Sequence, residues 1–170
     1  MGIGYVPEDR RIFSDLTVWE NLDVAAKSSG SAATQWTVDR VFEFFPDLKA
    51  IKNRRGGYLS GGQQQMLTIA RTLMGNPQLL LLDEHTAALD PKTAAKVLEL
   101  TDTVVRENKL TTLMITHNMQ QAIQYGNRMI MLHQGKIQLD IKGEEKAKLT
   151  VNDVVAKFGH SLKDEALLAV

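Results

Sequence analysis

Four consecutive leucines, Leu79 to Leu82, are followed directly by the carboxylates Asp83 and Glu84. Asn76-Pro77 marks a turn just before this run, so the leucines are expected to form one short strand. A strand with leucine at every position is typical of a parallel sheet that is buried on both faces. Such sheets bind ligands at the carboxyl ends of their strands, where we expect Asp83 to hold Mg²⁺, directly or through a water. Glu84 would then polarise a water for attack on a phosphate.

A turn containing two glycines precedes an amphipathic helix earlier in the chain. Ser60 and Gln63 form an S-x-x-Q capping box there, and Gly61 and Gly62 leave the N–H groups of the first turn uncovered by side chains. A helix start of this kind attracts anions, and a phosphate is the expected ligand. An ordinary capped helix after a glycine turn explains the same residues about equally well. The buried face is predicted from residues at helical spacing: Met66, Ile69, Ala70 and Leu73.

These two segments belong to a longer series of motifs. The series runs from Leu59-Ser60-Gly61-Gly62-Gln63 to the strand ending in Asp83 and Glu84, then to Ala88-Leu89-Asp90, and finally to a strand that ends at His117. It resembles the signature motif, Walker B, D-loop and switch histidine of the ABC-type ATPases. Each motif alone is weak to moderate, but four motifs in this order are very specific.

The resemblance implies a fold, cofactors and residue roles. The implied fold is a P-loop NTPase-like α/β core, here partial, with a mostly parallel sheet, a helical subdomain and a C-terminal β-hairpin. The implied cofactors are ATP and Mg²⁺. Asp83 would bind the metal, while Glu84 and His117 would be catalytic, with His117 bonded to the γ-phosphate and the attacking water. A capped turn is the other explanation of His117. The residues implied to contact the nucleotide are Ser60, Gly61, Gly62, Gln63, Asp90 and Glu8.

The first part of the chain resembles one subfamily, the ATPases of branched-chain amino-acid importers. The resemblance lies in Tyr5-Val6-Pro7-Glu8, then Arg10-Arg11-Ile12-Phe13, then 16–22 (LTVWENL). Glu8 stands where the family has its Q-loop glutamine, which senses Mg²⁺ and the transport partner. The implied partners are a second ATPase subunit and transmembrane permease subunits, at the cytoplasmic side of the inner or plasma membrane. For Arg10 and Arg11, a solvated loop and partner docking stay equally open.

The P-loop of the family has no counterpart in these 170 residues. A P-loop needs G-x-x-x-x-G-K-[ST] between a strand and a helix. The only Gly-Lys pair is Gly135-Lys136, which is expected in a hairpin and is followed by Ile137. The sequence therefore resembles the second, C-terminal portion of an ABC ATPase, a truncated form. We expect little or no ATP binding and no turnover by this chain alone, because P-loop amides and lysine supply most of the affinity.

Three functions compete at this stage. The first is an ATPase subunit, or a piece of one, that powers a membrane transporter. The second is a non-catalytic module that dimerises or regulates and keeps vestigial motifs, which the missing P-loop favours. The third is a chromosome-maintenance or repair ATPase, which we rank last because no heptads precede the signature motif.

The expected organisation has four parts: 1–8 (core strand and Q-loop start), 9–76 (helical subdomain), 77–158 (C-terminal half of the core) and 159–170 (tail). A link is expected at Ser28 to Ser31. Helices are predicted at Thr17 to Lys27, Val38 to Phe45, from Asp90-Pro91 onward, from Asn118 to Gly126, and at Thr150 to Phe158. Strands are predicted at 1–6, at Leu110 to Thr116, and in a hairpin turning at Gln134-Gly135. The strand absent with the P-loop would leave Leu110 to Thr116 with an unpaired edge, unless Arg128 to Leu132 pairs with it directly.

Composition narrows the partners and the chemistry. Lys and Arg together number 20, as do Asp and Glu, so the net charge is zero and no nucleic-acid partner is expected. There is no cysteine, which excludes disulfides and thiolate metal sites. Two positions depart from the family pattern: His85 stands where a proline is usual, and Ala87 or Ala88 replaces the D-loop serine.

Overall fold

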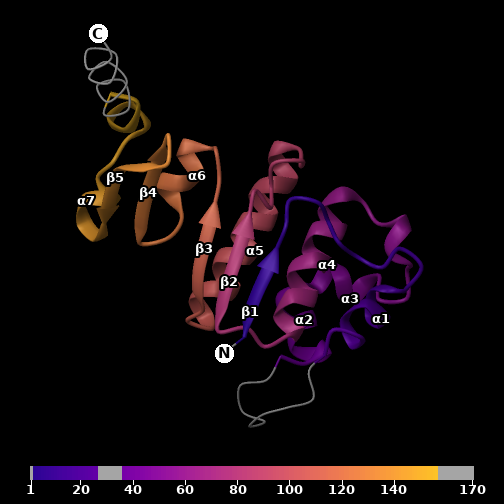
Figure 1. The fold of residues 1–170 in the computed structure, drawn as a ribbon. Coiled ribbons are helices and arrows are strands. Elements are labelled where there is room, and N and C mark those ends of the chain that lie inside the picture. The colour runs from indigo at the N-terminus through magenta and orange to yellow at the C-terminus, as the bar shows by residue number, and fades with distance from the viewer. Residues whose placement is uncertain (1, 27–35, 157–170) are drawn as a thin grey trace. The chain divides into compact units, whose positions relative to one another are not determined.

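The computed structural model describes residues 2–26 and 36–156, which form two compact units, Met1–Ile115 and Thr116–Val170. The expected link at Ser28 to Ser31 and the tail 159–170 lie outside the described residues. The first unit contains a parallel sheet and most of the helices, and the second contains a hairpin with short helices (Figure 1). The predicted α/β class, the mostly parallel sheet and the C-terminal β-hairpin are confirmed.

The sheet of the first unit has three parallel strands in the order β1-β2-β3. They are β1 (Ile3–Val6), β2 (Leu79–Asp83) and β3 (Thr111–Ile115). The register aligns Tyr5 with Leu81 and Leu81 with Leu113. All three strands therefore end at the same edge of the sheet, where β2 presents Asp83. β1 and β3 are its edge strands, and among the described residues of the first unit β3 pairs with β2, so the edge expected for Leu110 to Thr116 has no strand partner within this unit.

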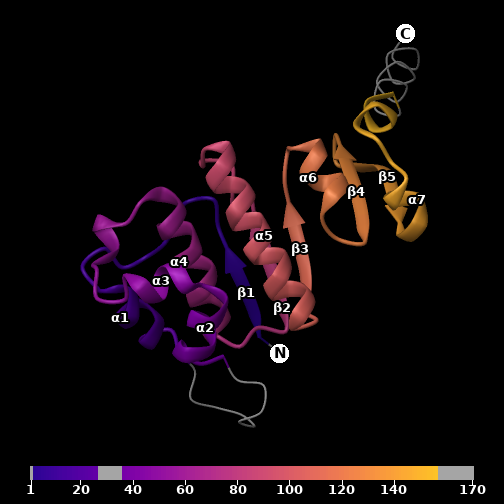
Figure 2. The ribbon, with the colours of Figure 1, turned by 180° about the vertical axis from the view of Figure 1, so that it is seen from behind.

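Two long helices cover one face of this sheet. They are α4 (Gly61–Met74), which begins with the predicted capping box, and α5 (Pro91–Glu107), which begins at the predicted cap Asp90. Figures 1 and 2 show opposite sides of the ribbon, and α5 crosses one face of the strands. Val6, Leu80 and Leu82 point into this layer and are 0%, 0% and 2% exposed. The helical faces predicted from spacing form the rest of the core, including Leu67, Ile69, Leu73 and Val97.

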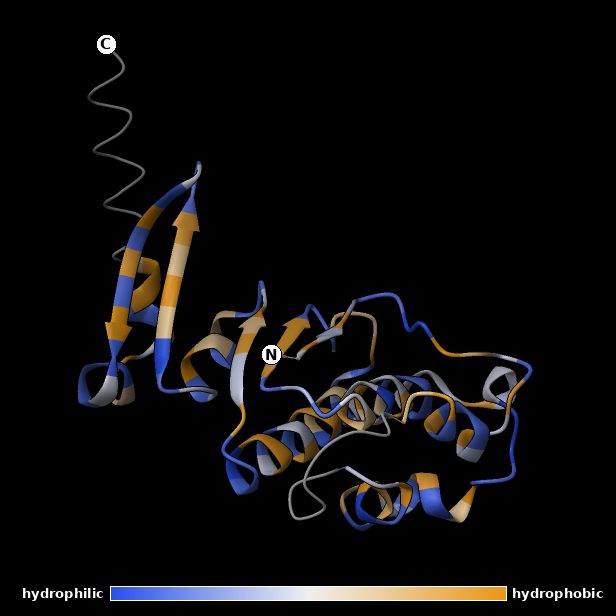
Figure 3. Cartoon of the chain, turned by 60° about the horizontal axis from the view of Figure 1, so that its bottom comes forward, coloured by the Kyte–Doolittle hydropathy of each residue, from blue (hydrophilic) through white to orange (hydrophobic). Residues whose placement is uncertain are grey.

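The other face of the sheet is open within the described residues, so the expectation that Leu79 to Leu82 is buried on both faces is wrong. In β2 only Leu80 and Leu82 are buried, and Leu79 and Leu81 stay partly exposed. The large apolar side chains of the edge strands on this face are half-exposed or more: Ile3, Tyr5, Leu113 and Ile115. In Figure 3 the long helices lie on one side of the three strands.

Short helices fill the segment between β1 and α4. They are α1 (Val18–Asp23), α2 (Val38–Phe44), α3 (Pro46–Ala50) and the 3₁₀ turn η1 (Gly56–Tyr58). The capping box of Thr17 and Glu20 is confirmed, but α1 ends at Asp23 instead of Lys27. Asn21 is fully buried, and its amide bonds the backbone N and O of Phe13 at 2.9 Å each. This pair of bonds fixes the loop after β1 to α1.

The second unit contains α6 (Met119–Gln124), β4 (Arg128–His133), β5 (Lys136–Lys142), α7 (Gly143–Ala147) and a helix at 151–156. Gln134 and Gly135 have φ of 47° and 75°, which is the geometry of a tight hairpin turn. Lys146 is 3% exposed and donates to the backbone oxygens of Ile123 and Tyr125, so its charge caps the end of α6. In the described ranges, no helix has the length and apolarity needed to span a bilayer.

Candidate functional site

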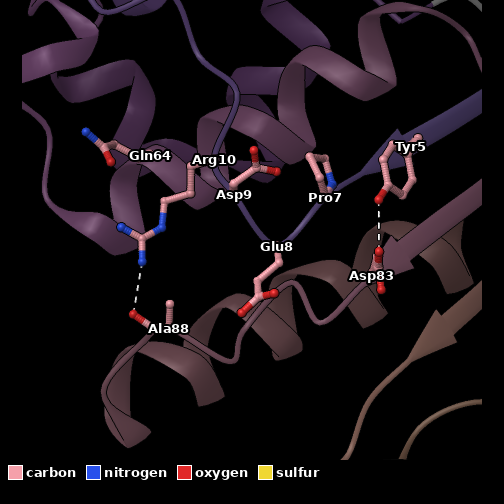
Figure 4. Close-up of a pocket in the computed structure, with 8 residues that line it drawn as sticks. All are labelled: Tyr5, Pro7, Glu8, Asp9, Arg10, Gln64, Asp83 and Ala88. Carbon is pink, nitrogen blue, oxygen red and sulfur yellow. Dashed lines mark hydrogen bonds between the residues drawn. The ribbon is translucent and has the colours of Figure 1, made fainter.

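An open polar pocket of about 570 Å³ lies at the carboxyl ends of β1 and β2. It is the place where open α/β sheets bind ligands. Figure 4 shows the residues that line it, which come from β1 and the loop after it, from β2, from α4 and from the loop before α5. They are Tyr5, Pro7, Glu8, Asp9, Arg10, Gln64, Asp83 and Ala88.

Asp83, the expected metal ligand, is the last residue of β2 and faces this pocket. The hydroxyl of Tyr5, on the neighbouring strand, donates to its Oδ2 at 2.8 Å (Figure 4). This hydrogen bond to the carboxylate is the main cause that raises the pKa of Tyr5, since the bond favours the protonated phenol. Tyr5 therefore orients one carboxylate oxygen of Asp83 and leaves the other available to the pocket.

Glu84, the expected catalytic base, turns the chain away from the sheet. Its φ is +46°, a left-handed conformation that is uncommon for a residue with a side chain. The backbone N–H still donates to the oxygen of Ile115 at 3.1 Å, which extends the pairing of β2 with β3 by one residue. Strain of this kind persists where the surroundings fix the residue, and it often occurs at functional sites.

The signature turn at the start of α4 is fully formed. The Ser60 hydroxyl accepts from the Gln63 N–H at 3.3 Å, and Gln63 Oε1 accepts from the Ser60 N–H at 3.0 Å. The two glycines allow close contacts: a Cβ on Gly61 would lie 2.8 Å from Nη1 of Arg10, and one on Gly62 would lie 2.2 Å from the Thr93 methyl. The glycines thus serve packing in this unit, besides leaving the helix N–H groups uncovered.

Asp90, which the resemblance places at the nucleotide, acts locally as the N-cap of α5. Its Oδ1 accepts from the Thr93 N–H at 3.1 Å. Hydrogen bonds from Thr93 lower the pKa of this carboxyl, since they favour the charged form. A role for Asp90 at a nucleotide is untested by this geometry.

The remaining predicted residues are split between the two units. Glu8 is exposed and lines the same pocket as Asp83. His117 follows β3 by two residues in the chain and precedes Asn118, which is the N-cap of α6. It belongs to the second unit, so its role beside Glu84 stays a prediction.

The donor set suits Mg²⁺ only together with a phosphate ligand. Among the described residues no group of three His, Cys, Asp or Glu side chains is arranged to hold a metal ion. Mg²⁺ is usually bound through one or two carboxylates, waters and the phosphates of its substrate. Asp83, with one oxygen oriented by Tyr5, fits that pattern.

The sequence did not predict the contacts that Tyr5 and Arg10 make at this pocket, nor the burial of His85. Tyr5 and Arg10 reach partners 78 residues away, and no local pattern marks such contacts. His85 is 3% exposed and its Nε2 lacks a hydrogen-bond partner in the described part of the chain. Burial lowers the pKa of His85 to about 4, so its imidazole is neutral near pH 7. In the sequence, the one sign that His85 is unusual was that it stands where the family usually has a proline.

Comparison with known proteins decides the family. The profile of the ABC transporter family matches residues 1–87, which is half of the chain. The chain belongs to the ABC transporter family. This confirms the resemblance drawn from the order of the signature, Walker B, D-loop and histidine motifs.

The related ABC proteins include ATPases of amino-acid transport. The chain is 53% identical over 116 residues to the tyrosine transport ATP-binding protein of Clostridioides difficile, covering 68% of this chain and 46% of the relative. It is 41% identical over 135 residues to the high-affinity branched-chain amino acid transport ATP-binding protein BraG of Pseudomonas aeruginosa, covering 79% and 58%. The chain thus spans about half the length of these relatives.

Solved ABC structures share the fold. The protein cbiO1 from Clostridium perfringens, part of the ABC transporter complex cbiONQ, aligns with a TM-score of 0.72 at 23% identity, covering 99% of this chain and 68% of that one. A dimeric ATP-binding cassette in a post-hydrolysis state with ADP and Pi aligns with a TM-score of 0.65 at 29% identity, covering 83% and 62%. The predicted ABC ATPase fold is therefore confirmed.

Proposed function

We propose that these residues supply the signature helix and the carboxylate end of β2 to an ATP-hydrolysing cassette that powers an amino-acid importer. The support comes from the pocket at the strand ends, from the formed signature turn and from two relatives named for amino-acid transport. Family members bind ATP with Mg²⁺, and ATP is the ligand proposed for this site.

Each predicted residue has a role in this proposal. Asp83 holds Mg²⁺ together with phosphate oxygens and waters, and Tyr5 keeps its carboxylate oriented. Glu84 accepts a proton from the attacking water, and His117 donates to the γ-phosphate. The start of α4 faces the nucleotide of a second cassette through Ser60, Gly61, Gly62 and Gln63. Glu8 and Asp90 also contact the nucleotide in this proposal.

The open sheet face is the single observation that carries the proposal. Parallel sheets are stable in water when both faces are covered, yet Leu113 is 53% exposed and Ile3 is 65% exposed. The same open face adjoins Tyr5 and Asp83 at the pocket. We infer that the P-loop portion of a cassette packs on this face and brings its phosphate-binding loop to Asp83.

The proposal includes partners, placement and organisation. The partners are a second cassette and transmembrane permease subunits, at the cytoplasmic side of the membrane. The proposed organisation is the one expected from the sequence: residues 1–8 begin the core, 9–76 are the helical subdomain and 77–158 complete the core, while 159–170 lie outside the described residues.

The test is to join the P-loop portion of the Clostridioides difficile relative to this chain and to measure phosphate release with Mg-ATP. We expect hydrolysis by the joined protein and none by the chain alone, because the chain has no P-loop lysine. The matched control is Glu84→Gln in the joined protein, which keeps size and hydrogen bonding but removes the base. Hydrolysis that survives Glu84→Gln would contradict the assigned role.

A non-catalytic module is the second candidate function, and the missing G-x-x-x-x-G-K-[ST] pattern favours it. In that case the signature turn and carboxylates are inherited architecture. A joined protein that folds and binds ATP but releases no phosphate above the Glu84→Gln control would support this candidate over hydrolysis.

A further inference from the structure

Arg10 connects three segments that are far apart in the sequence. It lies on the loop after β1, and its Nη2 donates to the backbone oxygen of Ala88 at 2.9 Å. Ala88 belongs to the loop between the carboxylates and α5. Figure 4 shows the guanidinium reaching from its own loop to this oxygen beside Gln64 of α4.

The same guanidinium lies against the first residue of α4. A Cβ built on Gly61 would be 2.8 Å from Nη1 and 3.2 Å from Cζ of Arg10, so the guanidinium would have to shift to make room for it. Glycine at this position therefore leaves the space that the guanidinium occupies. Arg10 thus contacts the signature turn with one side of its fork and the loop after Glu84 with the other.

This placement does not arise from favourable helix electrostatics. The amino-terminal end of a helix carries partial positive charge, so a cation beside Gly61 is disfavoured there. The hydrogen bond to the Ala88 oxygen offsets that cost, since a charged donor makes a stronger bond than a neutral one. The fixed, planar fork of arginine allows both contacts at once.

Arg10 is also not needed to hold its own loop. Arg71 of α4 donates to the backbone oxygen of Arg11, and the guanidinium of Arg71 stacks on Phe13 with 4.4 Å from Cζ to the ring centroid. Asn21 bonds both backbone groups of Phe13. Because these contacts fix the loop independently, the side chain of Arg10 acts on the segments that it reaches.

We propose that Arg10 is a positioning residue that ties the loop 84–90 to the start of α4, so that the carboxylate end of β2 and the signature turn move as one body. This inference rests on the proposed function for its consequence in ATP hydrolysis. Its structural part, the tie itself, can be measured without nucleotide.

The first test is amide hydrogen exchange on the 170-residue chain. The reporter amides are Ala87, which donates to the oxygen of Glu84 at 2.9 Å, and Leu89, which donates to that of Thr86 at 3.2 Å. Arg10→Ala should speed the exchange of these amides about tenfold, because the loop loses one hydrogen bond from a charged donor and such a bond contributes a stability of that order. The Phe13 amide, held by Asn21, should keep its rate. Arg11→Ala is the matched control, since that side chain pairs only with exposed Asp9 among the described residues and should leave the reporters unchanged.

A double-mutant cycle with Gly61→Ala separates this tie from a general loosening. The added methyl should displace the guanidinium and speed the same reporter amides when Arg10 is present. In the Arg10→Ala background it should have no further effect, because the group it displaces is gone. Arg10→Lys keeps a charged donor for the Ala88 oxygen but lacks the planar fork, so it should restore reporter protection only in part. The proposal would be overturned if Arg10→Ala left the exchange rates of the reporter amides unchanged. It would also be overturned if Gly61→Ala had its full effect in the Arg10→Ala background.

The hydrolysis arm uses the joined protein described above. We expect Arg10→Ala to lower kcat for ATP about tenfold with KM within twofold, since the residue positions groups without holding the nucleotide. An equal rise in KM with kcat unchanged would contradict the positioning role. If the unsubstituted joined protein hydrolyses no ATP, the proposed function fails, while the exchange results still decide whether the tie exists.

Discussion

The two faces of the three-stranded sheet differ although the same strands build them. On the helix-covered face, Val6 and Leu80 are fully buried against α4 and α5. On the open face, their neighbours in the strands, Tyr5 and Leu113, are at least half exposed. The residue types are equally apolar on both faces. What differs is whether the described residues of the first unit supply a layer to cover them.

This difference indicates which part of the site is complete. The signature turn lies on the covered side of the fold, and its caps and glycine contacts are all satisfied within the unit. The carboxylate of Asp83 lies beside the open face, where a half-exposed tyrosine is its hydrogen-bond partner. The chain therefore presents one finished element, the signature turn, and one, the carboxylate end of β2, whose surroundings we propose are completed by a covering segment.

The largest expected effect comes from leucine truncation on the two faces. Leu80→Ala should lower the free energy of unfolding by about 2–5 kcal/mol, because it leaves a cavity under α4 and α5. Leu113→Ala, the matched truncation on β3, should change it by about 0.5 kcal/mol or less, since the side chain is 53% exposed. Urea unfolding of both variants measures the contrast. Equal losses would mean that the open face is covered in solution.

The buried His85, which follows β2, should make the free energy of unfolding depend on pH. Its folded pKa of about 4 lies below the unfolded value near 6.5, so the folded state favours neutral imidazole. The stability that depends on neutral His85 is fully present above pH 6.5. It is lost as the pH falls toward 4, where the loss in the free energy of unfolding reaches roughly 3 kcal/mol. Unfolding of the chain and of His85→Leu between pH 7.5 and 4 gives this difference, because the carboxylates are common to both. Parallel pH curves would show that His85 is accessible in solution.

Loss of the cap on the signature turn should have an intermediate effect. Ser60→Ala removes the acceptor for the Gln63 N–H and should cost about 1 kcal/mol in unfolding free energy. Ser14, in the loop before α1, offers a control substitution to alanine away from any cap on α4. A change within the error of that control would contradict a formed capping box.

Tyr5→Phe on the open face should have the smallest effect on stability. It removes the hydroxyl that donates to Asp83 but keeps the ring, and the hydrogen bond is exposed to solvent, so we expect an unfolding midpoint within the error of that of the unsubstituted chain. Spectroscopic titration should show the raised phenol pKa of Tyr5 in the unsubstituted chain and its return toward 10 in Asp83→Asn. If the phenol pKa of Tyr5 were the same in Asp83→Asn as in the unsubstituted chain, the hydrogen bond would be excluded.

Much of the fold could be predicted because its signals are local. The caps at Thr17, Ser60 and Asp90 and the tight turn at Gln134 each depend on a few neighbouring residues. The open face could not be predicted from the leucine run, since leucine at every position carries no alternation to distinguish a covered face from a bare one.

The contacts that organise the candidate site are the part that sequence patterns miss. The residues of each pair, Tyr5 with Asp83 and Arg10 with Ala88, are 78 positions apart in the chain. The parallel pairing of β1 with β2 brings their segments together. The glycines of the signature turn were predicted for an anion, and the structure adds Arg10 and Thr93 as the groups that need their space. Such pairings follow from tertiary packing, which a local pattern does not encode.

One substitution on the open face tests the central claim most directly. Leu113→Asp places a charge where the P-loop portion is proposed to pack, and Ala95→Asp, on the exposed side of α5, is its control. We predict that both variants of the chain fold with a Tm near that of the unsubstituted chain. In the joined protein, Leu113→Asp should abolish ATP hydrolysis while Ala95→Asp preserves it. Full hydrolysis by Leu113→Asp would contradict the claim that this face receives the P-loop portion.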